Sequence, residues 1–133
     1  MKRIVLSGRV QSGKNDASHW LGKFNEPYSQ KTGMRIFPGS LNLRLDQSFD
    51  WFAPMYKSEV VRFGREEYGG DRDILLLPCT LVNLGNRRAF FWTTTTAAHD
   101  RLDPSLVEII TDIKLREAYG LTDGSVVDVE LDL

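Results

Sequence analysis

The sequence predicts a mainly β fold, either a small closed β-barrel or a compact β-rich α+β domain, with one or two short helices. Short segments rich in Val, Ile, Leu, Thr and aromatic residues recur along the chain, whereas helical patterns are few. A parallel α/β sheet would need helical crossovers between its strands, and this chain has too little predicted helix to supply these crossovers. Closure of an antiparallel sheet into a barrel would also remove exposed strand edges.

Seven segments are predicted to be strands. The clearest is Leu41–Leu45, in which leucines alternate with Asn42 and Arg44, so that the leucines face the core. A turn at Asn83–Asn86 is expected to join two other strands as a hairpin. The remaining predicted strands are Arg3–Val10, Glu59–Phe63, Ile74–Val82, Arg87–Thr95, Leu106–Ile110 and Ser125–Leu131.

Two short helices are expected in addition. The first begins at Asn15 or Asp16, either of which can cap it, and Pro27 limits its extension. The second spans Lys114–Tyr119 and closes at Gly120, where a left-handed cap is favoured. The apolar residues of the first helix recur at helical spacing and are predicted to form one face: Ala17, Trp20, Leu21 and Phe24.

Length and composition favour a single domain spanning residues 1–133. A chain of 133 residues can bury one substantial core, and its hydrophobic fraction of 41% and charged fraction of 26% are those of an ordinary globular protein. The net charge of −1 provides no basic surface for a nucleic-acid backbone, so nucleic acid is not an expected partner. We expect a monomer.

The chain has no recognisable targeting or membrane segment. The apolar run near the N-terminus, Ile4–Leu6, is far shorter than the core of a signal peptide, and no apolar run is long enough to span a bilayer. The single cysteine, Cys79, lies within an apolar run and can form neither an internal disulfide nor a Cys-rich zinc site. We therefore expect a cytoplasmic protein with a buried, unreactive thiol.

The segment Gly8–Asn15 matches the G-x-x-x-x-G-K pattern of a phosphate-binding P-loop and lies between a predicted strand and a predicted helix. The match fails at Asn15, where a P-loop needs a Ser or Thr hydroxyl for magnesium, and in the fold, which lacks a parallel sheet. We interpret the segment as a glycine-containing loop in which Lys14 and the following helix N-terminus can contact phosphate oxygens. The alternative is a simple surface turn.

A Pro-Gly turn at Phe37–Gly39 leads directly into the alternating strand. The same alternation that buries the leucines places the Ser40 hydroxyl and the Asn42 amide oxygen side by side on the polar face. Hard oxygen ligands of this kind suit a magnesium ion that also holds substrate phosphates. The alternative is a half-buried strand with a solvated polar face.

Three parts of the chain resemble the archaeal CTP-dependent riboflavin kinase family. The first is Ser7–Gly13, and the second and most specific is Phe37–Leu43, which is similar to the family's P-x-G-T-L-N-L. The third part consists of short segments in the family's order: Leu77–Cys79, His99, Val107–Ile110, Lys114–Glu117 and Leu121–Gly124. The resemblance implies a small β-barrel of the cradle-loop type that transfers a phosphoryl group from CTP to riboflavin and makes FMN.

The resemblance also implies roles for individual residues. Ser40 and Asn42 stand where the family's Thr and Asn hold magnesium and the transferring phosphate, which makes them the expected catalytic and metal-binding residues. Thr96 and Glu108 correspond to flavin-contacting positions. The expected nucleotide-binding residues are Gly13, Lys14, Asn15, Asp16, Ala17, Ser18, Ile113, Lys114, Leu115 and Arg116. Magnesium is the implied cofactor, and CTP and riboflavin are the implied small-molecule substrates.

Several alternatives stay open from the sequence alone. Glu108 either takes the proton of the flavin 5′-hydroxyl or only hydrogen-bonds the ligand. Phe90, Phe91 and Trp92 either offer a stacking face for the flavin ring or pack in the core, and core packing is favoured for Phe90 and Trp92.

The chain also departs from the family. The family has glycines where this chain carries Asn15 and Ala17, which leaves open whether CTP or ATP is the donor. A few additional residues precede Glu108, Arg101–Pro104 among them. A non-catalytic barrel that binds a flavin or a nucleotide is therefore the alternative function, and a purely structural domain is a third possibility.

Overall fold

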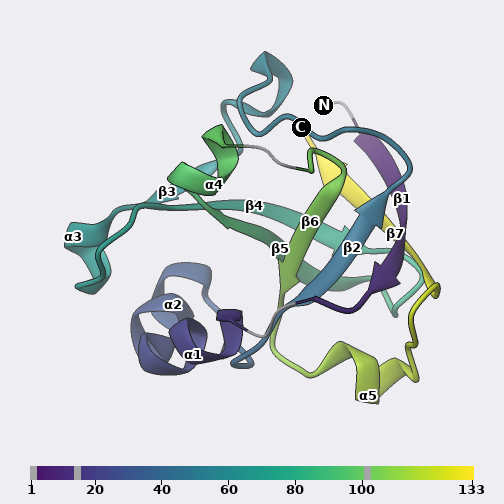
Figure 1. Ribbon diagram of the computed structural model, residues 1–133, viewed down its shortest axis with the longest axis horizontal. Coiled ribbons are helices and arrows are strands. Elements are labelled where there is room, and N and C mark those ends of the chain that lie inside the picture. The colour runs from purple at the N-terminus through teal and green to yellow at the C-terminus, as the bar shows by residue number, and fades with distance from the viewer. Residues whose placement is uncertain (1–2, 14–15, 101–102) are drawn as a thin grey trace.

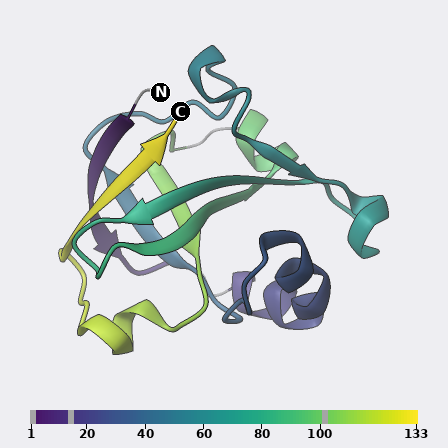
Figure 2. The same cartoon turned by 180° about the vertical axis from the view of Figure 1, so that it is seen from behind.

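The computed structural model describes residues 3–13, 16–100 and 103–133, and in this part of the chain seven antiparallel strands form one sheet whose ends meet. The strands are β1 (Arg3–Gln11), β2 (Leu41–Leu45), β3 (Val61–Phe63), β4 (Ile74–Leu81), β5 (Arg87–Thr94), β6 (Leu106–Ile110) and β7 (Val126–Asp132). Their order is β3-β4-β5-β6-β2-β1-β7, and β4 also pairs with β7. Six of these described strands therefore close into a barrel, with β3 added at the edge of β4 (Figures 1 and 2).

The predicted closed β-barrel is confirmed, and the seven strands differ from their predicted bounds by one or two residues at some ends. Every strand pair in the described part of the chain is antiparallel. The fold therefore lacks the parallel sheet on which a P-loop depends.

Strand β2 has the alternation that its sequence predicts. Leu41, Leu43 and Leu45 are 5%, 0% and 3% exposed and belong to the core inside the barrel, whereas Arg44 is exposed and Asn42 is half-buried. Neighbouring strands fix this orientation, because β2 pairs with β1 on one side and with β6 on the other.

Strands β4 and β5 are buried on both faces, which explains their nearly continuous apolar sequences. Leu75 and Leu77 of β4 face the barrel core, and the intervening Ile74 and Leu76 belong to a second apolar cluster. Helices α1 (Asp16–Lys23) and α2 (Asn25–Thr32) contribute to this second cluster through Ala17, Leu21 and Tyr28. The helix pair therefore packs against the outside of the barrel wall (Figure 1).

Helix α1 confirms the first predicted helix, but Pro27 does not end the helical segment. The chain bends at Phe24, and α2 begins at Asn25, so Pro27 falls in the first helical turn. A residue there has no intrahelical partner for its N–H, so proline costs no hydrogen bond. The second predicted helix is α5 (Leu115–Tyr119), which closes at Gly120 with a left-handed φ of 61° as expected.

Five helices occur in the described part of the chain, more than the one or two that the sequence predicts, and α2, α3 and α4 lie in segments where no helix is predicted. The four-residue α3 (Arg65–Tyr68) is too short to give a periodic pattern, and it begins at Gly64, whose N–H donates to the Glu67 side chain. The α4 helix (Thr95–His99) follows β5 directly, and the Thr94 hydroxyl caps it by accepting from the Ala97 N–H. A short 3₁₀ helix spans Pro54–Tyr56.

Cys79 is 6% exposed, in agreement with the expectation of a buried thiol, and burial raises its pKa above the ordinary value. Among the described residues, no helix has both the length and the apolar character needed to cross a membrane.

Gly8 allows β1 to pass close to β2. It pairs with Leu45 of β2, and a Cβ atom at residue 8 would lie 2.7 Å from the Arg44 carbonyl oxygen and 2.8 Å from Cγ of Leu43. We predict that Gly8→Ala lowers the free energy of unfolding by about 1–3 kcal/mol, since the barrel wall must shift to admit a methyl group. Urea unfolding of both proteins measures the difference.

Gly22→Ala provides the control for this substitution. A Cβ atom at residue 22 of α1 would meet only Pro38, at 3.7 Å, so the helical preference of alanine should raise stability by about 0.5–1 kcal/mol. Equal effects of the two alanine substitutions would contradict the proposed close approach of β1 and β2.

Candidate active site

Ser40, Asn42 and Glu108 form a polar cluster where β2 meets β6. The pairing of the two strands places Asn42 directly opposite Glu108. Ser40 precedes β2, and its hydroxyl donates a 2.9 Å hydrogen bond to Oε1 of Glu108. The structure therefore brings the two expected metal ligands together with one expected flavin contact.

The loop after β1 approaches this cluster through Gly13. A Cβ atom at residue 13 would overlap the side-chain amide nitrogen of Asn42. The Asn42 side chain would therefore have to shift to admit a larger residue at position 13, so Gly13 lies directly against the cluster. Lys14 and Asn15 lie outside the described residues, and Asp16 forms the start of α1.

A first cavity, of about 320 Å³, lies between α1 and α5, and we call it the α5 pocket. It is lined by the expected nucleotide-binding residues Ala17, Ser18, Ile113, Lys114, Leu115 and Arg116, and by Ser40. Two segments that are almost 100 residues apart in the sequence therefore form one cavity next to the polar cluster.

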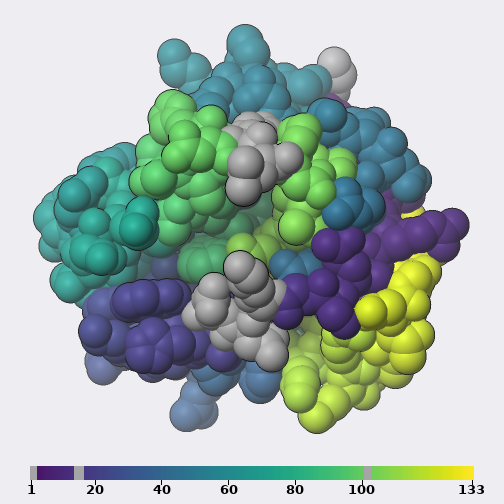
Figure 3. Space-filling view, viewed as in Figure 1, coloured from purple at the N-terminus to yellow at the C-terminus, as the bar shows by residue number. Residues whose placement is uncertain are grey.

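A second cavity, of about 620 Å³, lies on the other side of the polar cluster, and we call it the aromatic pocket. Asn42 and Glu108 line its inner end, and Thr96 lines it from α4, so both expected flavin contacts face the same cavity. Its aromatic lining residues are Trp20, Phe24, Tyr28, Tyr68 and Trp92. Figure 3 shows this face of the molecule hollowed between the surfaces of α4 and α1.

The aromatic residues that line this pocket are not the full set considered as a stacking face from the sequence. Phe90 and Phe91 are only 7% and 0% exposed and do not line the pocket, because they pack in the two apolar clusters. Trp92 is buried, as favoured, and also lines the pocket, and its Nε1 donates a 2.9 Å hydrogen bond to the Tyr28 hydroxyl. Burial raises the pKa of Tyr28, so this phenol stays protonated.

Sequence reasoning missed the helical part of this wall. Trp20 and Phe24 were expected on the buried face of the first helix, but Trp20 is 41% exposed and lines the aromatic pocket. An exposed tryptophan beside a cavity is a signal of ligand binding, yet helical periodicity alone cannot distinguish a wall residue from a core residue.

A small cavity of about 160 Å³, the central pocket, joins the other two. Ser40 and Arg116 line both it and the α5 pocket, whereas Gly13 and Asn42 line both it and the aromatic pocket. The polar cluster therefore lies between two cavities that open onto it from opposite sides.

Arg116 is held at the edge of the central pocket by Asp123. Its Nη2 lies 2.7 Å from Oδ1 of Asp123, and the Ser12 hydroxyl donates to the same carboxylate at 2.9–3.0 Å. These contacts tie the end of β1 to the turn that precedes β7 and orient the guanidinium beside the central pocket.

The donor set at the cluster fits magnesium. No group of three or more His, Cys, Asp or Glu side chains able to hold a metal occurs among the described residues. Magnesium instead prefers a few hard oxygen ligands together with substrate phosphates, and Ser40, Asn42 and Glu108 supply oxygens of this kind. Because the Ser40 proton is donated to Glu108, the lone pairs of its oxygen remain available to a cation.

A family model for the CTP-dependent riboflavin kinase domain, described as domain of unknown function DUF120, matches residues 10–131. The chain belongs to the CTP-dependent riboflavin kinase family. The match includes every residue of the polar cluster and the linings of the three cavities, so the family resemblance covers the candidate site in full.

Curated archaeal proteins named riboflavin kinase are similar to this member of the family over most of its length. The chain is 32% identical to that of Methanocella arvoryzae over 96% of its own length, and 27% identical to that of Methanosarcina barkeri over 96%. It spans 57% and 56% of the lengths of these two relatives. It is also 23% identical to the riboflavin kinase of Staphylothermus marinus, over 95% of this chain and 90% of the relative.

Arg116 and Ser12 hold the pKa of the Asp123 carboxyl below its ordinary value. Because this pKa is lower in the folded than in the unfolded state, the charged carboxylate stabilises the fold at pH values above the unfolded-state pKa. This stabilisation is lost as the pH falls through the folded-state pKa. We predict that Arg116→Gln raises the Asp123 pKa toward the ordinary value of 3.8. A carbon-detected NMR titration of the carboxyl group measures both values.

Lys114→Gln is the matched control, because Lys114 pairs with Glu117 and not with Asp123. It should leave the Asp123 pKa unchanged. An Asp123 pKa that is the same in the Arg116→Gln variant and the unmodified protein would contradict the assigned ion pair.

Proposed function

We propose that this protein is a riboflavin kinase that transfers the terminal phosphate of a nucleoside triphosphate, with CTP as the expected donor, to the 5′-hydroxyl of riboflavin. The observation that carries the proposal is the position of the Ser40–Asn42–Glu108 cluster between two separate cavities. Phosphoryl transfer requires two substrates to meet at one polar centre. Family membership supports the same reaction.

The nucleotide is assigned to the α5 pocket and the flavin to the aromatic pocket. The volumes of about 320 and 620 Å³ lie within the range of roughly 300–1,000 Å³ that small-molecule sites occupy. The aromatic side chains suit a flat conjugated ring, whereas Lys114 and Arg116 supply cations near the phosphates. The triphosphate would then extend from the α5 pocket into the central pocket, toward Gly13 and Asn42.

Magnesium would be held by Ser40 and Asn42, and when bound it would neutralise negative charge on the phosphates. Glu108 accepts the Ser40 proton, so the lone pairs of the Ser40 oxygen would be available to the ion. Arg116 and Lys114 offset further negative charge on the nucleotide.

The transfer forms a bond between the flavin 5′-oxygen and the terminal phosphorus and breaks the bond from that phosphorus to the bridging oxygen, which leaves with the nucleoside diphosphate. A carboxylate has about four lone-pair positions, so Glu108 can accept from Ser40 and also from the 5′-hydroxyl. In this position Glu108 orients the attacking oxygen and can receive its proton.

The deciding experiment incubates the purified protein with riboflavin, magnesium and either CTP or ATP, and measures FMN by chromatography. We expect FMN formation, faster with CTP than with ATP, and none when EDTA removes the metal. Faster turnover with ATP would mean that the donor differs from the expected one. Absence of FMN from a folded protein that binds riboflavin or a nucleotide would favour the alternative of a non-catalytic binding barrel.

Substitution of Asn42 tests the metal assignment. We predict that Asn42→Ala lowers kcat/KM by at least about 100-fold, because a ligand that positions transition-state charge is lost, while the unfolding midpoint changes little. Gln47→Ala is the control, since Gln47 is an exposed amide residue just beyond β2 and lines none of the three cavities. A folded Asn42→Ala protein with normal turnover would overturn the assignment.

Substitution of Ser40 tests whether the hydroxyl itself matters. Ser40→Thr retains the hydroxyl and should keep most activity, whereas Ser40→Ala removes both the oxygen ligand and the donor to Glu108 and should lower kcat/KM on the order of 100-fold. Equal activities of the two variants in the FMN assay would exclude a role for the hydroxyl.

A further inference from the structure

The aromatic pocket has charged groups at both of its ends. Glu108 lies at the inner end, where β2 and β6 meet, and Asp71 and Arg72 line the pocket from the loop between α3 and β4. These three are the charged residues that line the pocket within the described part of the chain. Figure 1 shows α3 on the side of the molecule opposite to β2 and β6. Between α3 and these two strands, α1 and α2 lie below and α4 lies above.

Side-chain and backbone contacts at its end hold the loop that carries Asp71 and Arg72 in place. The Asp73 carboxylate pairs with Arg62 and Arg65 at 3.1 and 3.2 Å, and its carbonyl oxygen accepts from the N–H of Thr95 at 2.9 Å. The Tyr68 hydroxyl donates to the carbonyl oxygen of Arg72. The loop is therefore anchored to α3, β3 and α4 at Arg72 and Asp73.

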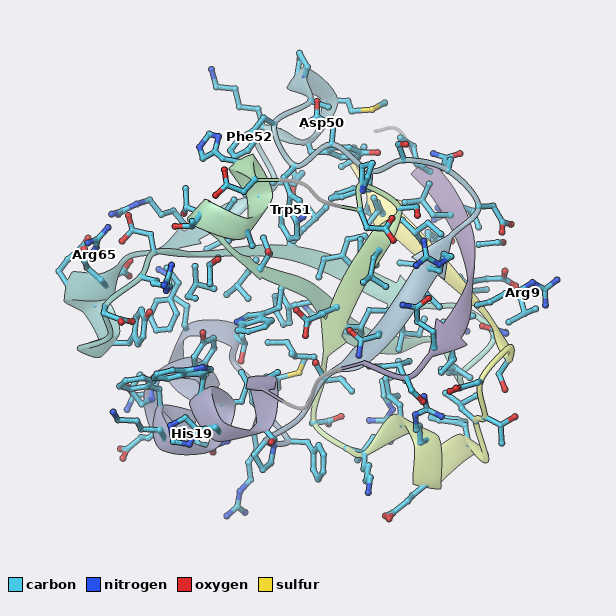
Figure 4. All side chains as sticks on the ribbon, viewed as in Figure 1. Arg9, His19, Asp50, Trp51, Phe52 and Arg65 are labelled. Atoms are coloured by element: carbon cyan, nitrogen blue, oxygen red, sulfur yellow. The ribbon has the colours of Figure 1, made fainter. Side chains whose placement is uncertain are left out.

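The side chains of Asp71 and Arg72 take no part in this anchoring. Among the described residues, the Arg72 guanidinium and the Asp71 carboxylate make no ion pair or hydrogen bond with another side chain, whereas the nearby Arg62 and Arg65 are both paired with Asp73. Figure 4 marks Arg65 at the outer end of α3. A fixed backbone thus presents a donor and an acceptor at the rim of an aromatic cavity.

A ligand that fills this pocket must match groups at both ends. Its hydroxyl would lie at Glu108, its flat body between the aromatic walls, and its far edge beside Asp71 and Arg72. The pyrimidine edge of a flavin ring offers a carbonyl oxygen, an imide N–H and a second carbonyl oxygen in a row. Arginine can donate to such oxygens, and a carboxylate can accept from such an N–H.

We propose that Arg72 and Asp71 recognise the polar edge of the flavin ring, with Arg72 donating to a ring carbonyl oxygen and Asp71 accepting from the imide N–H. This inference rests on the proposed function, because it takes riboflavin as the occupant of the aromatic pocket. The aromatic walls alone would stack against many flat rings, so the two charged residues provide the specificity for the flavin.

The test measures riboflavin binding directly, through the quenching of flavin fluorescence. Arg72→Met and Asp71→Ala should each raise the Kd for riboflavin roughly ten-fold, as expected for loss of a hydrogen bond to a charged group, and should leave the KM for the nucleotide unchanged. Arg35→Met is the control, because Arg35 is exposed and lines none of the α5, aromatic and central pockets. Its Kd should equal that of the unmodified protein.

A flavin analogue separates recognition from a structural effect. N3-methylriboflavin lacks the imide N–H, so it should bind the unmodified protein roughly ten-fold more weakly than riboflavin. The Asp71→Ala variant should bind riboflavin and the analogue equally well. A variant that discriminates as strongly as the unmodified protein would overturn the role of Asp71, whatever its stability.

The outcomes also separate this inference from the proposed function. FMN formation together with an unchanged Kd in both pocket variants would overturn the recognition of the ring edge and leave the kinase function standing. Weakened binding in both variants without FMN formation would support the recognition and overturn the kinase function. Failure of the unmodified protein to bind riboflavin would overturn both.

Discussion

The register of β2 between β1 and β6 is the constraint on which the site depends. With Leu41, Leu43 and Leu45 inside the barrel, Ser40 and Asn42 must lie on the opposite side. A shift of the register by one residue would turn the leucines toward the polar cluster and the Ser40 and Asn42 side chains into the core. Such a shift is unfavourable because the leucines would lose their apolar burial. The core of the barrel therefore fixes the position of the polar cluster.

Burial on both faces of β4 and β5 also positions the helices α1 and α2. One face completes the barrel core, and the other holds α1 and α2, so the helices cannot separate from the wall without exposing Leu21 and Tyr28. These helices form the lower boundary of the aromatic pocket (Figure 1). The aromatic pocket thus arises between elements that are held in place by separate apolar contacts.

The strands could be predicted from the sequence because each carries either a period-two alternation, as in β2, or an apolar run, as in β4. Of the missed helices α2, α3 and α4, the last two contain only four and five residues, and capping contacts from Glu67 and Thr94 determine them more than periodicity does. The polar cluster could be anticipated because Ser40 and Asn42 share a strand face and Glu108 matched the family. The pocket walls could not be anticipated, because Trp20, Tyr68 and Trp92 meet only through the tertiary packing of three separate segments.

Ala17 lines both the α5 pocket and the aromatic pocket, and its side chain is 4% exposed. One methyl group on α1 is thus part of the partition between the two cavities. A larger residue at this position would narrow both cavities at once, and a glycine would widen both. Position 17 therefore couples the shapes of the two cavities, so a substitution there cannot alter one cavity without altering the other.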